Sequence, residues 1–334
     1  MKLKVKYFFL FLCFLAGGIY VGTAVFGQQT GNHSSVTQNT ESATLQTSTN
    51  IVHRWETYFK TLHSFEYSGS LTYPANMPLT GGYTPPVSPG STLKMDFAFE
   101  NSHYYARLLY PATSETKKFN SYVSTYDGKN YQSLQATQKG QTELFIVSPT
   151  SDSSPNYSGA DPFFLLFAFT FAGKEQNVYD ISMFKKQSFW DNFAQKVQRV
   201  IKNKNGNTEL TVYSDTNKQE ALIRYEVEVD NATGLPKTIK IFTNQDNSLQ
   251  GQVQVDRFTK INNINFATTI SAYEVDPATN SLKKSSEFNI DVSTLKVNTP
   301  IDSGIFTIPK TQADIIAEDG IITILDHPKL PNTK

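Results

Sequence analysis

The chain has 334 residues, with 30 basic and 30 acidic side chains and a single cysteine, Cys13. This balanced charge gives no electrostatic attraction to nucleic acid, so nucleic-acid binding is excluded as the main function. Because one cysteine cannot form an internal disulfide or a cysteine-based zinc site, the folded part must depend on a large hydrophobic core.

The amino terminus has the pattern of an export signal. A basic leader, MKLKVK, precedes an apolar run from Tyr7 to Phe26 and a polar break. We therefore predict that residues 1–27 are a signal peptide, or a membrane anchor because the run is long enough to span a bilayer. Either outcome places the protein in the periplasm or at the cell envelope. Residues 28–50 are rich in Ser, Thr, Gln and Asn, which predicts a disordered polar linker.

The folded part is expected to begin with an amphipathic helix at residues 51–62, because Ile51, Trp55, Phe59 and Leu62 share one helical face. Strands follow. In residues 92–100, apolar and polar side chains alternate strictly, which predicts a half-buried strand. The sequence YDGKNY at residues 126–131 places an Asp-Gly turn between two strands and predicts a hairpin.

The middle of the chain carries an unusually apolar stretch, DPFFLLFAFTFAG, at residues 161–173. Asp161 suits a helix cap and Pro162 the first helical position, so we predict a helix over residues 161–172 that is apolar on nearly every side. This helix is too short to cross a bilayer. It is either ordinary core or the cover of a hydrophobic cavity. A further helix is predicted over residues 187–200.

The second half returns to alternating strands, as in residues 223–229. In total, about ten strands and three helices predict an α+β fold. We expect a strongly curved antiparallel sheet, an unclosed half β-barrel, with the helices on its concave face. Residues 51–310 form this half-barrel domain. Residues 311–334 form a C-terminal extension whose apolar pattern indicates one more helix or strand.

Several segments together carry a family resemblance. They are the helix and strand at residues 51–73, the strand ending ARLLYP at 106–111, the YDGKNY hairpin, the DPFFLL helix, the segment INNINFATTISAYEVD, and the segment DVSTLKVNTPIDSGIFTIP with Phe306 shortly before Ile308 and Pro309. Their order over residues 51–309 resembles the LolA and LppX group of exported lipid and lipoprotein carriers. The resemblance implies an unclosed barrel with helices in its mouth. It also implies that Arg107 corresponds to an arginine that such carriers place after the second or third strand.

The predicted function is a non-catalytic carrier that binds an acyl chain, or the lipid of a lipoprotein, in a cavity between the sheet and the apolar helix. The predicted partners are this lipid and the envelope membranes or a membrane-bound acceptor, and we expect a monomer without cofactor or metal. The site residues form three groups and one outlier. They are the lid (Phe163, Phe164, Phe167 and Phe171), the wall (Trp190 and Phe193), the floor (Leu93, Met95, Phe97 and Phe99), and Arg107.

Two other functions stay open. The 17 tyrosines are compatible with an aromatic groove in an envelope glycan-binding or adhesion module. A secreted hydrolase would need a carboxylate pair from distant strands. However, the five histidines show no metal-binding spacing, and the sequence has no phosphate loop and no nucleophile elbow. A catalytic function is therefore not expected.

Overall fold

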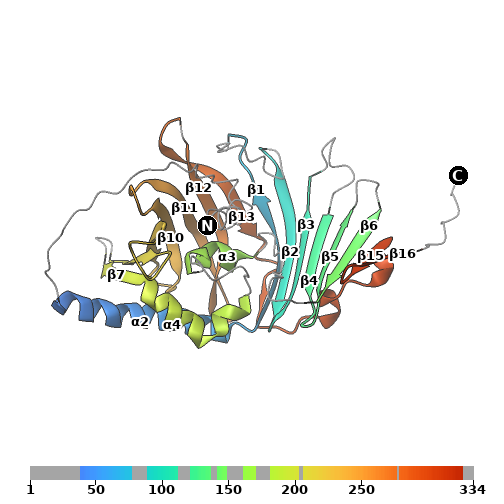
Figure 1. Cartoon of the computed structure of the whole chain (residues 1–334), viewed down its shortest axis with the longest axis horizontal. Helices are drawn as coiled ribbons and strands as arrows, with labels where there is room; N and C mark the ends of the chain where they lie inside the picture. Colours follow the sequence, from blue (N-terminus) through green and yellow to red (C-terminus); the bar gives the residue numbers. More distant parts are fainter. Residues whose placement is uncertain are drawn as a thin grey trace.

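The computed structural model describes residues 38–76, 89–111, 121–136, 141–148, 161–170, 181–202, 206–276 and 278–325 (Figure 1). One sheet of sixteen strands runs through these residues. In the first half of the chain its strands are β1 (Ser64–Thr72), β2 (Thr92–Glu100), β3 (His103–Leu109), β4 (Ser121–Tyr126), β5 (Tyr131–Ala136) and β6 (Thr142–Val147). The second half adds β7 (Val197–Lys202), β8 (Thr208–Tyr213), β9 (Ile223–Val229), β10 (Pro236–Thr243), β11 (Leu249–Ile261), β12 (Ile264–Asp276), β13 (Ser281–Ile290), β14 (Lys296–Val297), β15 (Ile315–Glu318) and β16 (Ile321–Ile324).

The strands follow the order β16-β15-β6-β5-β4-β3-β2-β1-β13-β12-β11-β10-β9-β8-β7, and β14 pairs with β1. Neighbouring strands are antiparallel except for β15, which is parallel to β6. The end strands β7 and β16 do not pair with each other among the described residues, so the sheet is unclosed. This confirms the predicted large, mostly antiparallel open sheet.

Three α-helices and four 3₁₀ turns accompany the sheet in the described ranges. They are α2 (Gln38–Thr61), α3 (Pro162–Phe167), α4 (Gln187–Lys196), η1 (Ala168–Thr170), η2 (Ile181–Lys185), η3 (Ser303–Phe306) and η4 (Lys310–Gln312). No helix within the described ranges is long and apolar enough to span a membrane.

The helices lie against one half of the sheet. Helix α2 contacts β7, α4 and η2, while α3 contacts β10 and β12. In Figure 1 these helices gather beside the half that contains β7–β13, and the half made of β3–β6, β15 and β16 extends away from them. The main core lies between this helix layer and the sheet.

Register aligns the aromatic side chains of the central strands on the core face. Phe65 of β1 lies opposite Phe99 of β2, and Tyr67 lies opposite Phe97. On the other side of β1, Leu71 lies opposite Phe288 of β13. Paired residues in an antiparallel sheet point to the same face. The observed register therefore places all of these cross-strand pairs on the core face.

Two details of the predicted fold were wrong. The sheet has sixteen strands instead of about ten, and the helices, which were predicted on the concave face, lie against one half of the sheet. The extra strands come partly from the C-terminal extension, where β15 and β16 join the sheet beside β6. Asp314 fixes this addition, because its Oδ2 accepts hydrogen bonds from the Thr142 backbone N–H at 2.7 Å and from Thr142 Oγ1 at 2.9 Å.

The helix boundaries also differ from the prediction. Helix α2 begins at Gln38, inside the range predicted to be a disordered linker. The third predicted helix, 187–200, ends at Lys196, and strand β7 begins at Val197. For the apolar helix, residues 162–167 are α-helical and 168–170 are 3₁₀, while 171 and 172 lie outside the described residues.

Candidate functional site

The candidate site is built around α3, which lies between the sheet and helix α2. Asp161 is buried and caps the helix, since its Oδ1 accepts a hydrogen bond from the Phe163 backbone N–H at 2.8 Å. At the other end, Thr170 Oγ1 donates to the carbonyl of Phe167 at 2.6 Å. These two bonds close the ends of an element whose side chains are otherwise apolar, so α3 is held in place mainly by packing.

Phe163 joins α3 to both neighbouring layers. Its ring centroid lies 5.2 Å from that of Phe59 on α2, 5.4 Å from Phe65 on β1 and 5.1 Å from Phe266 on β12. All three pairs are edge-to-face, the arrangement that aromatic quadrupoles favour. One side chain of the helix therefore touches α2 and two strands of the sheet.

Phe167, one turn later, packs against the other helices. Its ring centroid lies 5.4 Å from Trp55, 5.0 Å from Phe59, 5.5 Å from Phe184 and 6.2 Å from Trp190. The ring itself is fully buried. Phe167 is therefore enclosed by aromatic side chains of α2, η2 and α4.

The predicted floor residues share the core face of β2. Leu93, Met95, Phe97 and Phe99 are all buried, and they belong to the same hydrophobic cluster as Phe163 and Phe167. Phe97 and Phe99 each lie 5.6 Å from Phe65, measured between ring centroids. Strand β1 thus connects the floor to the lid.

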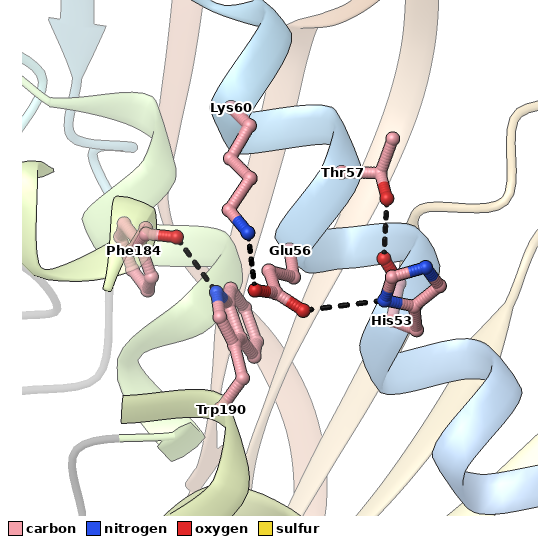
Figure 2. A network of polar contacts seen from close by, with 6 residues as sticks. All are labelled: His53, Glu56, Thr57, Lys60, Phe184 and Trp190. Atoms are coloured by element: carbon pink, nitrogen blue, oxygen red, sulfur yellow. Dashed lines mark hydrogen bonds and ion pairs between the residues drawn. The ribbon is translucent and has the colours of Figure 1, made fainter. Parts of the chain in front are cut away.

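The predicted wall residues are held by α4. Figure 2 shows Trp190 Nε1 donating a hydrogen bond to the Phe184 carbonyl, at 2.6 Å, which ties α4 to η2. The Trp190 ring stacks on Phe184 at 5.7 Å, and Phe193 lies 6.0 Å from Trp55. The structure therefore brings the wall, the floor and the described lid residues into one cluster.

One predicted site residue, Arg107, lies outside this cluster, and the side chains of two others are not described. Arg107 lies on the opposite face of the sheet, where its Nη2 pairs with Asp96 Oδ2 at 2.6 Å. Strand alternation explains this position, because Ala106 and Leu108 occupy the core face of β3. The side chain of Phe164 and the whole of Phe171 lie outside the described residues.

Several members of the cluster were missing from the predicted site. They are Trp55, Phe59, Phe65, Phe184, Phe266 and Tyr225. The helical spacing of Trp55 and Phe59 indicated a buried face, but the sequence did not show what that face touches. Phe184 and Phe266 carried no local signal for the site, because their place depends on contacts between distant segments.

The core face continues beyond the helices as a row of tyrosines. Tyr104 of β3 lies 6.3 Å from Tyr126 of β4, and Tyr126 stacks on Tyr131 of β5 at 4.5 Å. Tyr104 is buried, whereas Tyr126 and Tyr131 are partly exposed. Cross-strand register places the three rings on one face, so the buried aromatic cluster passes into a more accessible aromatic surface.

A polar cluster on α2 borders the site. Figure 2 shows Glu56 between Lys60, whose Nζ donates to Oε1 at 2.6 Å, and His53, whose Nδ1 lies 3.2 Å from Oε2. The bond from Lys60 is the main cause that lowers the pKa of Glu56, His53 acts in the same direction, and burial opposes both.

The Glu56 cluster is expected to stabilise the fold near neutral pH and to lose this effect in acid. Since the pKa is lower in the folded state, the stabilisation is present above the unfolded pKa and disappears as pH falls through the folded pKa. Wild type should exceed Glu56→Gln in unfolding free energy by about 0.5 kcal/mol near neutral pH, and the difference should disappear in acid, as the pH falls through the folded pKa of Glu56. Thermal unfolding of both proteins at several pH values between neutral and acid would measure this difference in unfolding free energy. A difference independent of pH would contradict it.

Among the described residues, the carboxylates of β9 lie on the face opposite the aromatic cluster. No group of three or more His, Cys, Asp or Glu residues in these ranges is arranged to hold a metal ion. Glu226 and Glu228, which lie on the outward face of β9, accept hydrogen bonds from Arg224 Nη1 and Asn207 Nδ2, each at 2.6 Å. The aromatic cluster itself offers apolar contact, which suits a hydrocarbon ligand.

Comparisons with known proteins add three similar structures. No protein-family model and no curated protein sequence matches the chain. A DUF1329 family protein from Desulfovibrio piger is 10% identical, with a TM-score of 0.43, and the match covers 79% of this chain and 97% of that one. A domain described as an outer membrane lipoprotein-sorting protein from Vibrio parahaemolyticus is 11% identical, with a TM-score of 0.42, over 80% and 97% of the two chains.

The third structure is a LolA superfamily protein from Nitrosomonas europaea. It is 11% identical, with a TM-score of 0.42, and the match covers 78% of this chain and 97% of that one.

Proposed function

We propose that the protein is an exported, non-catalytic carrier that binds the acyl chain of a lipid or lipoprotein beneath α3. The observation that carries this proposal is the construction of α3. It is a six-residue apolar helix that separates the aromatic face of the sheet from α2. The basic leader and apolar run at residues 1–27 support export to the periplasm or cell envelope.

Helix α3 is suited to act as a movable lid. A helix of six residues has no stability of its own in water, so its position depends on tertiary contacts. It lies against β10 and β12, while α2 and α4 contact each other and β7. Lifting α3 would therefore uncover the aromatic face of the sheet and leave the pair formed by α2 and α4 in place.

The free energy lost when the lid side chains leave the core is similar to the free energy gained when an acyl chain is buried in their place. Displacing the buried side chains of Phe163, Leu166, Phe167 and Phe169 would cost about 6 to 12 kcal/mol in lost burial. Burying an acyl chain of about fourteen methylenes in their place would return about 11 kcal/mol. An acyl chain can thus replace the lid side chains without a large net cost, which a reversible carrier requires.

Tryptophan fluorescence tests this proposal directly, because the two tryptophans of the chain, Trp55 and Trp190, both contact Phe167. Fatty-acyl chains that carry bromine should quench their emission at saturation by at least about half, because a chain replacing Phe167 would touch both indole rings. The same chain without bromine serves as the ligand control. Native mass spectrometry of the purified protein should also detect copurified lipid.

A tryptophan outside the site provides the protein control. Phe242 packs against Arg224, whose Cζ lies 4.3 Å from the ring centroid. In a Trp55→Phe/Trp190→Phe background, the Phe242→Trp reporter should not be quenched by the brominated chain. If the native tryptophans also stay unquenched and no lipid copurifies, α3 is ordinary core and the carrier function is wrong.

A glycan-binding module is the second candidate. The stacked pair Tyr126 and Tyr131, at 4.5 Å and partly exposed, favours this alternative because it offers an aromatic surface without any movement of α3. Calorimetric titration with soluble oligosaccharides separates the two functions. Saturable heat of sugar binding, without quenching by brominated chains, would favour the glycan-binding module.

A further inference from the structure

One hydroxyl group in the buried cluster has no hydrogen-bond partner among the described residues. Tyr225 projects from β9 into the main core, and its side chain is almost completely buried. No donor or acceptor in the described part of the protein forms a hydrogen bond with its Oη. An unsatisfied buried hydroxyl destabilises a fold, and native proteins rarely keep one without a reason.

The alternation of side chains along β9 determines the face on which Tyr225 lies. On β9, Ile223, Val227 and Val229 are buried on the same side, while Arg224 and Glu226 form an ion pair on the other. A phenylalanine at position 225 would meet the same packing requirement without the hydroxyl. Core packing therefore explains the ring of Tyr225 and does not explain its oxygen.

The neighbour of this ring on the helix side belongs to the proposed lid. The ring centroid of Phe169 lies 6.2 Å from that of Tyr225. Phe169 is in η1, which follows α3 without a break, so it would leave together with α3. Tyr225 would then line the space that the acyl chain enters.

We propose that the Tyr225 hydroxyl donates a hydrogen bond to a carbonyl oxygen of the bound lipid, and that the ligand is an acyl ester or amide. This inference rests on the proposed carrier function and specifies its ligand. Burial raises the pKa of Tyr225 above its usual value, so the phenol stays protonated and neutral. A neutral donor in an apolar site suits a neutral carbonyl, because burying the carboxylate of a free fatty acid would carry a large desolvation cost.

The variant Tyr225→Phe tests the inference, since it removes only the oxygen. Two probes are compared, a fluorescent acyl ester and diphenylhexatriene, a hydrocarbon without polar atoms. Loss of one neutral hydrogen bond should weaken ester binding about three- to ten-fold. Binding of diphenylhexatriene should not change. Equal ester affinity in both proteins would overturn the inference.

Stability of the ligand-free protein gives a second readout. Tyr58→Phe is the matched control, because the Tyr58 hydroxyl donates to the Asn265 carbonyl at 2.8 Å and this variant breaks a bond of the fold. The melting temperature should fall in Tyr58→Phe and should stay equal or rise in Tyr225→Phe. A similar fall in both would show that the Tyr225 hydroxyl already has a partner, and the inference would be wrong. If wild type binds neither probe, the carrier function fails and this inference fails with it.

Discussion

Replacing Phe59 with alanine is expected to lower the free energy of unfolding by about 3 to 5 kcal/mol, the usual cost of deleting a fully buried phenylalanine ring. Phe59 is completely buried on the core face of α2. Its ring stacks on Phe184 at 4.2 Å and on Trp190 at 5.9 Å, and it meets Phe163 and Phe167 edge-to-face. The substitution removes a contact from α3, α4 and η2 together, so the surrounding side chains cannot all collapse into the cavity.

Phe242→Ala is the matched control for this prediction. It deletes the same ring from a position that is only partly buried. Because its partner, Arg224, also pairs with Glu226, we expect a loss of about 1 kcal/mol or less. Denaturant unfolding of both variants gives the comparison. Equal losses would show that Phe59 is not the centre of a tightly packed cluster.

The proposed carrier function predicts a further property of Phe59→Ala, namely its stabilisation by ligand. A cavity left by Phe59→Ala would lie beside Phe163 and Phe167, in the space where the acyl chain is proposed to bind. A saturating acyl ligand should therefore recover more stability in Phe59→Ala than it adds to wild type. In an ordinary core, the ligand would add no stability to wild type, because only the cavity of the variant could admit it.

Local sequence patterns predicted two elements of the cluster. The alternation in residues 92–100 predicted the buried face of β2, and the structure buries that face. Asp161 and Pro162 predicted the beginning of the apolar helix, and α3 begins at Pro162. Both signals are short-range, because strand alternation and helix capping are determined by a few consecutive residues.

Other elements needed information that local patterns do not contain. The apolar spacing of Phe189, Trp190 and Phe193 continues to Val197, so a helix over 187–200 was predicted. The structure ends α4 at Lys196 because Val197 begins a strand that pairs with β8, and β-branched residues favour this pairing. Here a partner distant in the sequence decided between two conformations that the local pattern allowed.

The position of Arg107 outside the cluster has a different origin. The resemblance assigned this residue to the ligand site, although its neighbours Ala106 and Leu108 were equally able to occupy the core face. A shift of one residue along a strand exchanges the two faces. In the structure, Arg107 pairs with Asp96 on the outer face, where Ser68 Oγ also donates to Asp96 Oδ1 at 2.6 Å. Alternation on β2, which puts Asp96 outward, would have placed its cross-strand partner outward as well.

The substitution Gly69→Ala adds only one methyl group, yet it is expected to destabilise the protein by about 2 to 3 kcal/mol. Gly69 lies in the middle of β1, opposite Ile290 of β13 and Met95 of β2. A Cβ atom at this position would come within 2.5 Å of the Asn289 carbonyl oxygen and 3.4 Å of its carbon. The obstacle is backbone within a paired strand, so it cannot rotate away as a side chain would.

The control for this prediction is Gly304→Ala, where the nearest atom to the added methyl group would be Asp302 Oδ1 at 3.3 Å, the end of a side chain. We expect this variant to change the unfolding free energy by less than about 0.5 kcal/mol.

Strand β1 pairs with β2 and β13 and carries Phe65 of the ligand site, so relieving the clash in Gly69→Ala must move strands apart beneath α3. Gly69→Ala should therefore also weaken acyl-chain binding. Denaturant unfolding together with quenching by a brominated chain would measure both effects, and a fully stable Gly69→Ala would show that β1 and β13 can separate at little cost.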